Sequence, residues 1–187
     1  NIHRGHSSLE KGEWNRNELV GTELRNKTLG IVGLGKIGRE VMDRCKAFGM
    51  SLIGYDPFVN QDMFNKDEIV IVDLDTLTQS ADYITLHVPL NDKTRDLFNY
   101  NRLCSMKPTS RIINVARGGI INEEDLAKAV TDGKIAGAAI DVFTSEPIDG
   151  THPLVGIQNI VLSPHLGAST KEAKEGVSRA VCEQVRD

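Results

Sequence analysis

A glycine-rich turn between an apolar strand and an amphipathic helix constrains the fold of this chain more than any other feature. Residues 28–32 are mostly apolar and β-branched, which predicts a buried strand. The sequence GLGKIG follows at residues 33–38, and apolar side chains then recur at helical spacing over residues 37–48. Gly49 is placed to end this helix, and a second strand is expected at residues 52–53. The order of strand, glycine turn, helix and strand predicts a βαβ unit.

The alternation of strands and helices continues along the chain. Further strands are expected at residues 69–72, 83–88, 111–115, 137–142 and 160–162. Further helices are expected at residues 74–79 after an Asp73 N-cap, at 101–106, between an Asn122 N-cap and Gly133, and at 170–185. Strands that alternate with helices predict an α/β fold, a Rossmann-like doubly wound parallel sheet. Residues 1–26 are interpreted as a polar connecting segment that is part helix.

The composition argues against several classes of function. The formal net charge is −4, and no run of Lys or Arg is long enough to follow a phosphate backbone, so no nucleic-acid partner is expected. No apolar stretch reaches transmembrane length and no signal-peptide pattern opens the chain, which favours a cytoplasmic protein without a membrane partner. Cys45, Cys104 and Cys182 lie far apart and are odd in number. We expect three packing residues, with no disulfide and no metal site.

The glycines at 33, 35 and 38 each have a physical role in binding a dinucleotide. Gly33 permits the tight turn out of the strand, Gly35 leaves space for the diphosphate, and Gly38 lets the helix pack closely on the sheet. The first helical amides, at Lys36, Ile37 and Gly38, then offer N–H groups and the positive end of the helix dipole to the phosphates. A glycine turn without a ligand is the alternative, but its position between a strand and a helix favours a cofactor site.

Asp56 predicts which dinucleotide is bound. It stands at the end of the second strand, about twenty residues beyond the glycines, where dinucleotide-binding sites place an acidic residue. A carboxylate there accepts hydrogen bonds from both ribose hydroxyls and repels a 2′-phosphate, so NAD is expected rather than NADP. Taken alone, Asp56 is equally consistent with a surface turn before Pro57. Its spacing from the glycines favours the cofactor site, with Pro57 beside it.

Other strand ends are expected to complete this site, because ligands of such sheets bind outside the carboxyl ends of the strands. The residues at these ends are Val88, Pro89, Val115, Ala116, Arg117 and Asp141. We expect their backbone groups, together with the Asp141 carboxylate, to hold the nicotinamide end. For Val88 and Pro89, a plain strand terminus is the alternative interpretation.

Six stretches of the sequence resemble the D-isomer-specific 2-hydroxyacid dehydrogenases: residues 29–39, 54–57, 87–90, 114–125, 141–147 and 163–173. The resemblance implies that residues 27–169 are the NAD-binding domain of a two-domain enzyme. It implies that a helix in residues 170–187 leads to a substrate domain outside this chain. It also implies a homodimer formed through the cofactor domain. The chain is therefore expected to bind NAD without completing catalysis alone.

The resemblance further implies a catalytic triad of Arg117, Glu146 and His165, with His165, Gly167 and Ala168 also near the cofactor. The chemistry of the triad suits the oxidation of a 2-hydroxy acid. His165 can act as a base near neutral pH, Glu146 can orient the imidazole, and Arg117 can bind the substrate carboxylate and carbonyl oxygen. Each residue alone would more often be structural, but their joint match to one family pattern favours catalysis.

The remaining histidines and the choice of substrate complete the expectations. His87 is expected to pack under the cofactor, and His3, His6 and His152 are expected to be solvated because they form no metal-ligand pattern. Within the family, the chain looks most like members that oxidise 3-phospho-D-glycerate to 3-phosphohydroxypyruvate, the first step of phosphorylated L-serine biosynthesis. The alternatives are a glyoxylate or hydroxypyruvate reductase of the same family and an NAD-sensing scaffold similar to the C-terminal-binding-protein corepressors.

Overall fold

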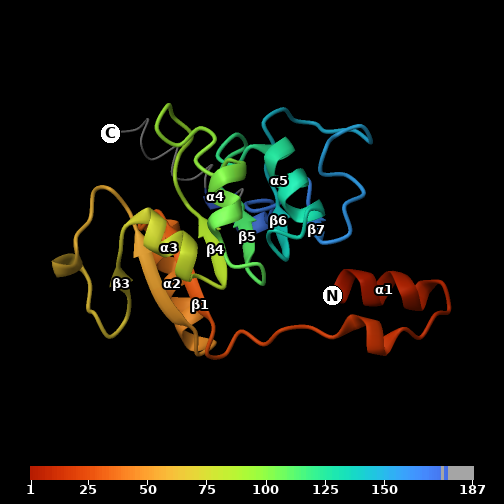
Figure 1. Ribbon diagram of the computed structural model, residues 1–187, viewed down its shortest axis with the longest axis horizontal. Helices are drawn as coiled ribbons and strands as arrows, with labels where there is room; N and C mark the ends of the chain where they lie inside the picture. The colour runs from red at the N-terminus through yellow and green to blue at the C-terminus, as the bar shows by residue number, and fades with distance from the viewer. Residues whose placement is uncertain (174, 177–187) are drawn as a thin grey trace.

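A seven-stranded parallel sheet forms the centre of the protein, in the strand order β3-β2-β1-β4-β5-β6-β7 (Figure 1). The computed structural model describes residues 1–173, 175 and 176. The strands are β1 (Thr28–Val32), β2 (Ser51–Tyr55), β3 (Val70–Ile71), β4 (Tyr83–Leu86), β5 (Arg111–Asn114), β6 (Gly137–Ile140) and β7 (Ile160–Leu162). The predicted doubly wound sheet is confirmed, because β1 to β3 add in one direction and β4 to β7 in the other.

Helices connect most of the strands. They are α1 (Ile2–Glu10), α2 (Lys36–Ala47), α3 (Leu74–Ser80), α4 (Tyr100–Ser105) and α5 (Glu123–Thr131), with short 3-10 helices η1 (Arg16–Leu19) and η2 (Gln61–Met63). The two predicted N-caps are confirmed: the Asp73 carboxylate accepts a hydrogen bond of 2.8 Å from the Thr76 amide, and the Asn122 side chain accepts one of 3.1 Å from the Asp125 amide. Gly133 follows α5 with a φ of 67°, a conformation that glycine adopts without strain.

Alternate side chains of β1 face two apolar cores. Leu29 and Ile31 pack with Met42 of α2, whereas Val32 belongs to a larger cluster. That cluster also contains one completely buried leucine from each of α3, α4 and α5: Leu77, Leu103 and Leu126. Helix α2 therefore covers one face of the sheet beside β1 and β2, and α3, α4 and α5 cover the other face.

The sheet reverses its winding direction between β1 and β4. These two strands are paired so that Val32 lies opposite Leu86, and the residues that follow, Gly33 and His87, meet at the carboxyl edge. The His87 amide donates a hydrogen bond of 2.7 Å to the Val32 carbonyl, which continues the pairing past the end of β4. A reversal of this kind opens a crevice at the carboxyl edge of a parallel sheet, and the candidate site lies there.

The N-terminal segment lies outside the sheet. Helices α1 and η1 pack together, and an extended stretch joins them to β1 (Figure 1). The side chains of Trp14 and Val20 in this segment are 78% and 80% exposed. The helix expected within residues 1–26 is thus present, although its position could not be predicted.

Some predicted boundaries differ from the structure. Strand β4 ends at Leu86 rather than at residue 88. Pro89 lies three residues beyond this end and has no amide hydrogen to donate to a ladder. Cys104 is exposed, so its prediction as a packing residue is wrong, and it lies on the short helix α4. Cys182 and most of the helix expected at residues 170–185 lie outside the described residues. In the part of the chain that the structure describes, no helix is long and apolar enough to cross a membrane.

Candidate functional site

The three glycines of the turn after β1 meet different surroundings. A Cβ atom added at Gly33, whose φ is 97°, would approach the His87 carbonyl oxygen to 2.5 Å. A Cβ atom at Gly38 would overlap the carbonyl oxygen of Gly33. A Cβ atom at Gly35 would meet no described atom within 4 Å. Gly33 and Gly38 are therefore required by close packing, whereas Gly35 borders open space.

Helix α2 presents its N-terminus to this open space. Its N-cap is Gly35, which has no side chain that could cap the first amides. Lys36 and Ile37 in the first turn are exposed, and the positive end of the dipole of this 12-residue helix points the same way. Amides without a capping side chain, beside a space that a Cβ atom would fill, fit the diphosphate of a dinucleotide.

Asp56 lies at the end of β2, and its carboxylate contacts the glycine turn directly. One carboxylate oxygen accepts a hydrogen bond of 2.9 Å from the Leu34 amide, and the other accepts one of 2.9 Å from the Phe58 amide. A carboxylate has about four acceptor positions, so two remain for ribose hydroxyls. The sequence predicted the ribose contact alone. The bond to Leu34 joins residues 22 positions apart and has no local sequence signal.

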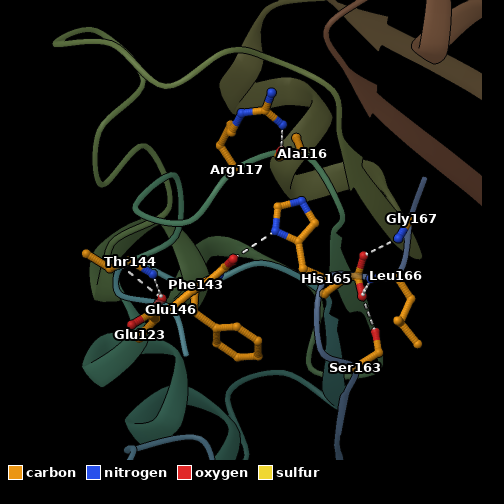
Figure 2. A network of polar contacts seen from close by, with 11 residues as sticks. Ala116, Arg117, Glu123, Phe143, Thr144, Glu146, Ser163, His165, Leu166 and Gly167 are labelled. Atoms are coloured by element: carbon orange, nitrogen blue, oxygen red, sulfur yellow. Dashed lines mark hydrogen bonds and ion pairs between the residues drawn. The ribbon is translucent and has the colours of Figure 1, made fainter. Parts of the chain in front are cut away.

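The side chains of His165 and Glu146 contact each other directly in the candidate catalytic site. His165 Nδ1 and Glu146 Oε2 are 2.8 Å apart (Figure 2). The other carboxylate oxygen of Glu146 accepts a hydrogen bond of 2.9 Å from the Phe143 amide. The bond from His165, followed by that from Phe143, holds the pKa of Glu146 below its ordinary value, so the group is a carboxylate at neutral pH. Because a carboxylate only accepts, Nδ1 carries the hydrogen and Nε2 of the neutral ring keeps a free lone pair.

Arg117 follows β5 and lies next to this pair without bonding to it. Its guanidinium donates a hydrogen bond of 2.6 Å to the Ala116 carbonyl, and Figure 2 shows it above the His165 ring. The next residue, Gly118, packs backbone to backbone against Phe143, where a Cβ atom would overlap the Phe143 carbonyl oxygen. The structure thus brings the loop of Arg117 to the loop of Glu146 while the guanidinium remains exposed.

Asp141 anchors the loop that carries His165. Burial alone would raise the pKa of the Asp141 carboxyl, but hydrogen bonds from Ser163 and from the Leu166 and Gly167 amides bring it below its ordinary value. The two amide bonds are each 2.8 Å long, and the side chain is 4% exposed. His165 lies between these contacts with a φ of 53°. The loop geometry therefore depends on a buried carboxylate, which retains one acceptor position for the expected nicotinamide contact.

The other predicted cofactor residues line the same edge of the sheet. Val88 follows β4 close to the glycine turn, since its Cγ1 atom is 2.9 Å from the position of a Cβ atom built on Gly33. The remaining predicted residues are exposed or half-buried after β2, β4, β5 and β7: Pro57, Pro89, Val115, Ala116 and Ala168. Val115 is 43% exposed, which leaves an apolar surface for a ring to pack against.

His152 was expected to be solvated, and this prediction is wrong. Its side chain is 13% exposed, and its Nε2 atom lies 3.1 Å from a carboxylate oxygen of Glu123, which is 15% exposed. The His152 ring also packs edge to face on Phe143, with the ring centroids 5.3 Å apart. Glu123 was not predicted to have a site role, because the two residues are 29 positions apart and match no local motif. Among the described residues, no cluster of three or more His, Cys, Asp or Glu side chains could hold a metal ion.

Residues 1–167 match the sequence profile of the D-isomer specific 2-hydroxyacid dehydrogenases, NAD binding domain. A D-3-phosphoglycerate dehydrogenase of Synechocystis sp. is 49% identical over 180 residues, which cover 96% of this chain and 32% of that protein. The chain thus spans about a third of the length of this relative.

Two solved structures share the fold of this chain. An NAD-dependent formate dehydrogenase from Staphylococcus aureus in complex with NAD has a TM-score of 0.90 at 32% identity, and the match covers 100% of this chain and 56% of that one. A glyoxylate reductase from Paecilomyes thermophila has a TM-score of 0.87 at 33% identity, over 96% of this chain and 54% of that one. The chain therefore belongs to the D-isomer-specific 2-hydroxyacid dehydrogenase family, in which it corresponds to the NAD-binding domain.

Proposed function

We propose that this chain is the cofactor domain of an enzyme that transfers a hydride between 3-phospho-D-glycerate and NAD. The single observation that carries the reaction type is the His165–Glu146 pair, at the same edge of the sheet as the glycine turn. The 49% identity to a D-3-phosphoglycerate dehydrogenase supports this substrate. The product is then 3-phosphohydroxypyruvate, and the reaction is the first step of phosphorylated serine biosynthesis.

The proposed domain arrangement has residues 27–169 as the NAD-binding domain, 1–26 as a connecting segment and 170–187 as the path to a substrate domain. The pocket beside His165 supports a second domain for substrate binding. Its other lining residues are Phe143, Glu146, Pro147, Ile148 and Pro164. A phosphate group is best bound by Arg, Lys or free amides, which this mostly apolar lining does not provide.

His165 is proposed to act as the base in oxidation of the 2-hydroxy acid. Its Nε2 lone pair takes the hydroxyl proton of the substrate, because Nδ1 is engaged with Glu146. The Glu146 carboxylate then stabilises the imidazolium and keeps the ring in orientation. NAD, when bound, supplies the hydride acceptor. In the reverse reaction, His165 returns the proton to the oxygen of the 2-oxo acid.

Arg117 is proposed to bind the substrate carboxylate and the developing carbonyl oxygen. Its guanidinium donates to the Ala116 carbonyl, an acceptor that it can exchange for the substrate by rotation of its own side chain. The backbone of the loop is held by the close contact of Gly118 with Phe143, so the loop does not have to move. The planar guanidinium of Arg can donate two parallel hydrogen bonds to a carboxylate, which the ammonium group of a Lys cannot do.

The proposed NAD contacts follow the carboxyl edge of the sheet. The diphosphate is assigned to the turn after β1, namely Gly33, Gly35, Lys36, Ile37 and Gly38. The adenosine ribose is assigned to Asp56 and Pro57. The nicotinamide end is assigned to Val88, Pro89, Val115, Ala116, Arg117, Asp141, His165, Gly167 and Ala168. The exposed space at Gly35 and the acceptor positions left on Asp56 support the first two assignments.

Steady-state kinetics of the complete protein test the substrate. We expect kcat/KM for 3-phospho-D-glycerate with NAD, and for 3-phosphohydroxypyruvate with NADH, to exceed the values for glyoxylate and hydroxypyruvate. The structural similarity to a glyoxylate reductase makes that activity the second candidate. A preference for glyoxylate would assign the chain to this second candidate. Retained NAD binding without turnover of any of these acids would contradict a dehydrogenase function.

Substitution of Asp56→Ala is expected to weaken NAD binding by roughly 10- to 100-fold, because two hydrogen bonds to a charged group are lost. Discrimination against NADP should fall, since the carboxylate no longer repels a 2′-phosphate. NADP affinity should nevertheless stay low, because the Leu34 amide of the glycine turn loses its acceptor. Calorimetric titration with both dinucleotides measures this, with Asp62→Ala as an exposed charge control. An unchanged ratio of NAD affinity to NADP affinity would show that Asp56 does not bind the ribose.

We also propose that the complete protein is a homodimer formed through this domain. The support is that three large apolar side chains of the N-terminal segment, Ile2, Trp14 and Val20, are each at least 78% exposed. Sedimentation equilibrium of the complete protein measures the mass, and a monomer at micromolar concentration would contradict the proposal.

A further inference from the structure

We infer that Glu123, supported by His152, is a positioning residue for Glu146: it fixes from the start of α5 the turn that carries the partner of the candidate base. The inference rests on the proposed roles of Glu146 and His165. Neither Glu123 nor His152 lies in the pocket beside His165, so they act through the turn and not on the substrate.

Glu123 holds the turn through Thr144. One carboxylate oxygen of Glu123 accepts two hydrogen bonds from that residue, 2.7 Å from its amide and 3.0 Å from its hydroxyl (Figure 2). Both donors sit one residue after Phe143 and two before Glu146. Hydrogen bonds to a charged acceptor are stronger than neutral ones, and here two converge on one oxygen. A loop that could take several conformations is thereby tied to a helix.

His152 fixes the orientation of the Glu123 carboxylate. The Leu154 amide donates to His152 Nδ1 at 3.3 Å, so the neutral ring carries its hydrogen on Nε2. That hydrogen points to the second oxygen of Glu123, 3.1 Å away. The same ring packs on the Phe143 side chain. His152 therefore holds both the carboxylate and the first residue of the turn.

The contacts continue from the turn to the candidate base. The Phe143 amide donates to one oxygen of Glu146, and His165 contacts the other, so the carboxylate is held from two sides. Gly118, in the Arg117 loop, packs closely against the Phe143 carbonyl. This contact leaves the turn little room to move on that side. A series of contacts thus runs from Glu123 to His165: hydrogen bonds join Glu123 to Thr144, Phe143 to Glu146 and Glu146 to His165, and the peptide bond between Phe143 and Thr144 connects them. Removal of the first member should loosen the last.

A second role for Glu123 has to be separated from positioning. An acidic residue in the first turn of α5 also stabilises the helix dipole, and Glu124 and Asp125 share this role. Glu124 is exposed and stands next to Glu123, so Glu124→Ala is a matched control for charge and helix stability. Positioning predicts an effect of Glu123→Ala on Glu146, whereas a purely structural role predicts an effect on the melting temperature alone.

The test measures the titration of the Glu146 carboxyl carbon by NMR in this chain. Hydrogen bonds from His165 and Phe143 lower the pKa of Glu146, while the nearby Asp141 charge acts in the opposite direction. In Glu123→Ala, we expect the midpoint to rise towards the ordinary value of a glutamate, because the turn no longer presents the Phe143 amide. Glu123→Gln keeps an acceptor for Thr144 and should shift the midpoint less. Glu124→Ala should leave it unchanged.

The complete protein provides the kinetic measurement. In Glu123→Ala, kcat should fall by roughly 10- to 100-fold, as expected for a misplaced catalytic group, with KM and NAD affinity near the wild-type values. His152→Gln should give a smaller effect in the same direction. An unchanged Glu146 midpoint and kcat in a folded Glu123→Ala chain would overturn the inference. If Glu123→Ala does not fold, unchanged values in His152→Gln would overturn it. If the complete protein turns over no 2-hydroxy acid, the proposed function fails, while the Glu146 midpoint still decides the role of Glu123.

Discussion

Substitution of Gly38→Ala is expected to reduce the NAD affinity of this chain by at least about 100-fold, or about 2.7 kcal/mol. The added Cβ atom would overlap the carbonyl oxygen of Gly33, and both partners are backbone. Relief of the overlap requires α2 to move away from the end of β1. The α2 amides and the glycine turn would then no longer face one diphosphate together. Overpacking of this kind costs about 1–3 kcal/mol. This cost is smaller than the free energy of unfolding of a typical domain, so the chain should still fold.

Two further glycines separate the loss of cofactor space from the loss of packing. A Cβ atom at Gly35 meets no described atom within 4 Å, so Gly35→Ala should leave the melting temperature unchanged but still weaken NAD binding, because the methyl group enters the proposed diphosphate space. A Cβ atom at Gly150 likewise meets no atom of the described residues within 4 Å and lies in a different loop, so Gly150→Ala should change neither quantity. Calorimetry and thermal melts of the three variants measure this. Normal NAD binding by Gly35→Ala would move the diphosphate away from the α2 N-terminus.

The parts of the fold that follow from local rules could be predicted from the sequence. Strands β1 and β7 have the predicted bounds, because apolar residues fill short segments that end at glycine or polar residues. Helices α3 and α5 begin after Asp73 and Asn122, whose side chains accept hydrogen bonds from the next turn. The N-terminal segment has no comparable pattern. Its apolar side chains are scattered and mostly exposed, so periodicity could not place α1.

The contacts that join distant loops could not be predicted. The Leu34–Asp56, Glu123–His152 and Asp141–Gly167 contacts each link residues more than twenty positions apart. A sequence pattern identifies the type of side chain at a strand end, but which donors reach it depends on how neighbouring strands stagger. The orientation of Arg117 is a similar case, since its rotamer depends on the nearest acceptor, the Ala116 carbonyl. The sequence thus identified the candidate catalytic residues, while their supporting contacts emerged from the fold.

Substitution of His165→Asn in the complete protein is expected to lower kcat by about 10²- to 10⁴-fold, the usual contribution of a general base. Asn is preferred to Ala because position 165 has a φ of 53°, a region that Asn adopts more readily than Ala. The loop should keep its shape, since Asp141 holds the Leu166 and Gly167 amides and not the imidazole. NAD affinity should therefore stay near the wild-type value, as measured by calorimetry.

The control for His165→Asn is His6→Asn, which alters an exposed histidine of α1 whose Nε2 atom lies 3.5 Å from a carboxylate oxygen of Glu10 in the same helix. It should change neither kcat nor NAD affinity. A fall in kcat with unchanged NAD affinity places His165 in the chemical step and leaves the glycine turn intact. A parallel fall in both would mean that the His165 side chain is itself needed for NAD binding, so that the loss of turnover does not arise in the chemical step alone. Turnover by His165→Asn within tenfold of wild type would show that the proton goes to another group, and the His165–Glu146 pair would then be structural.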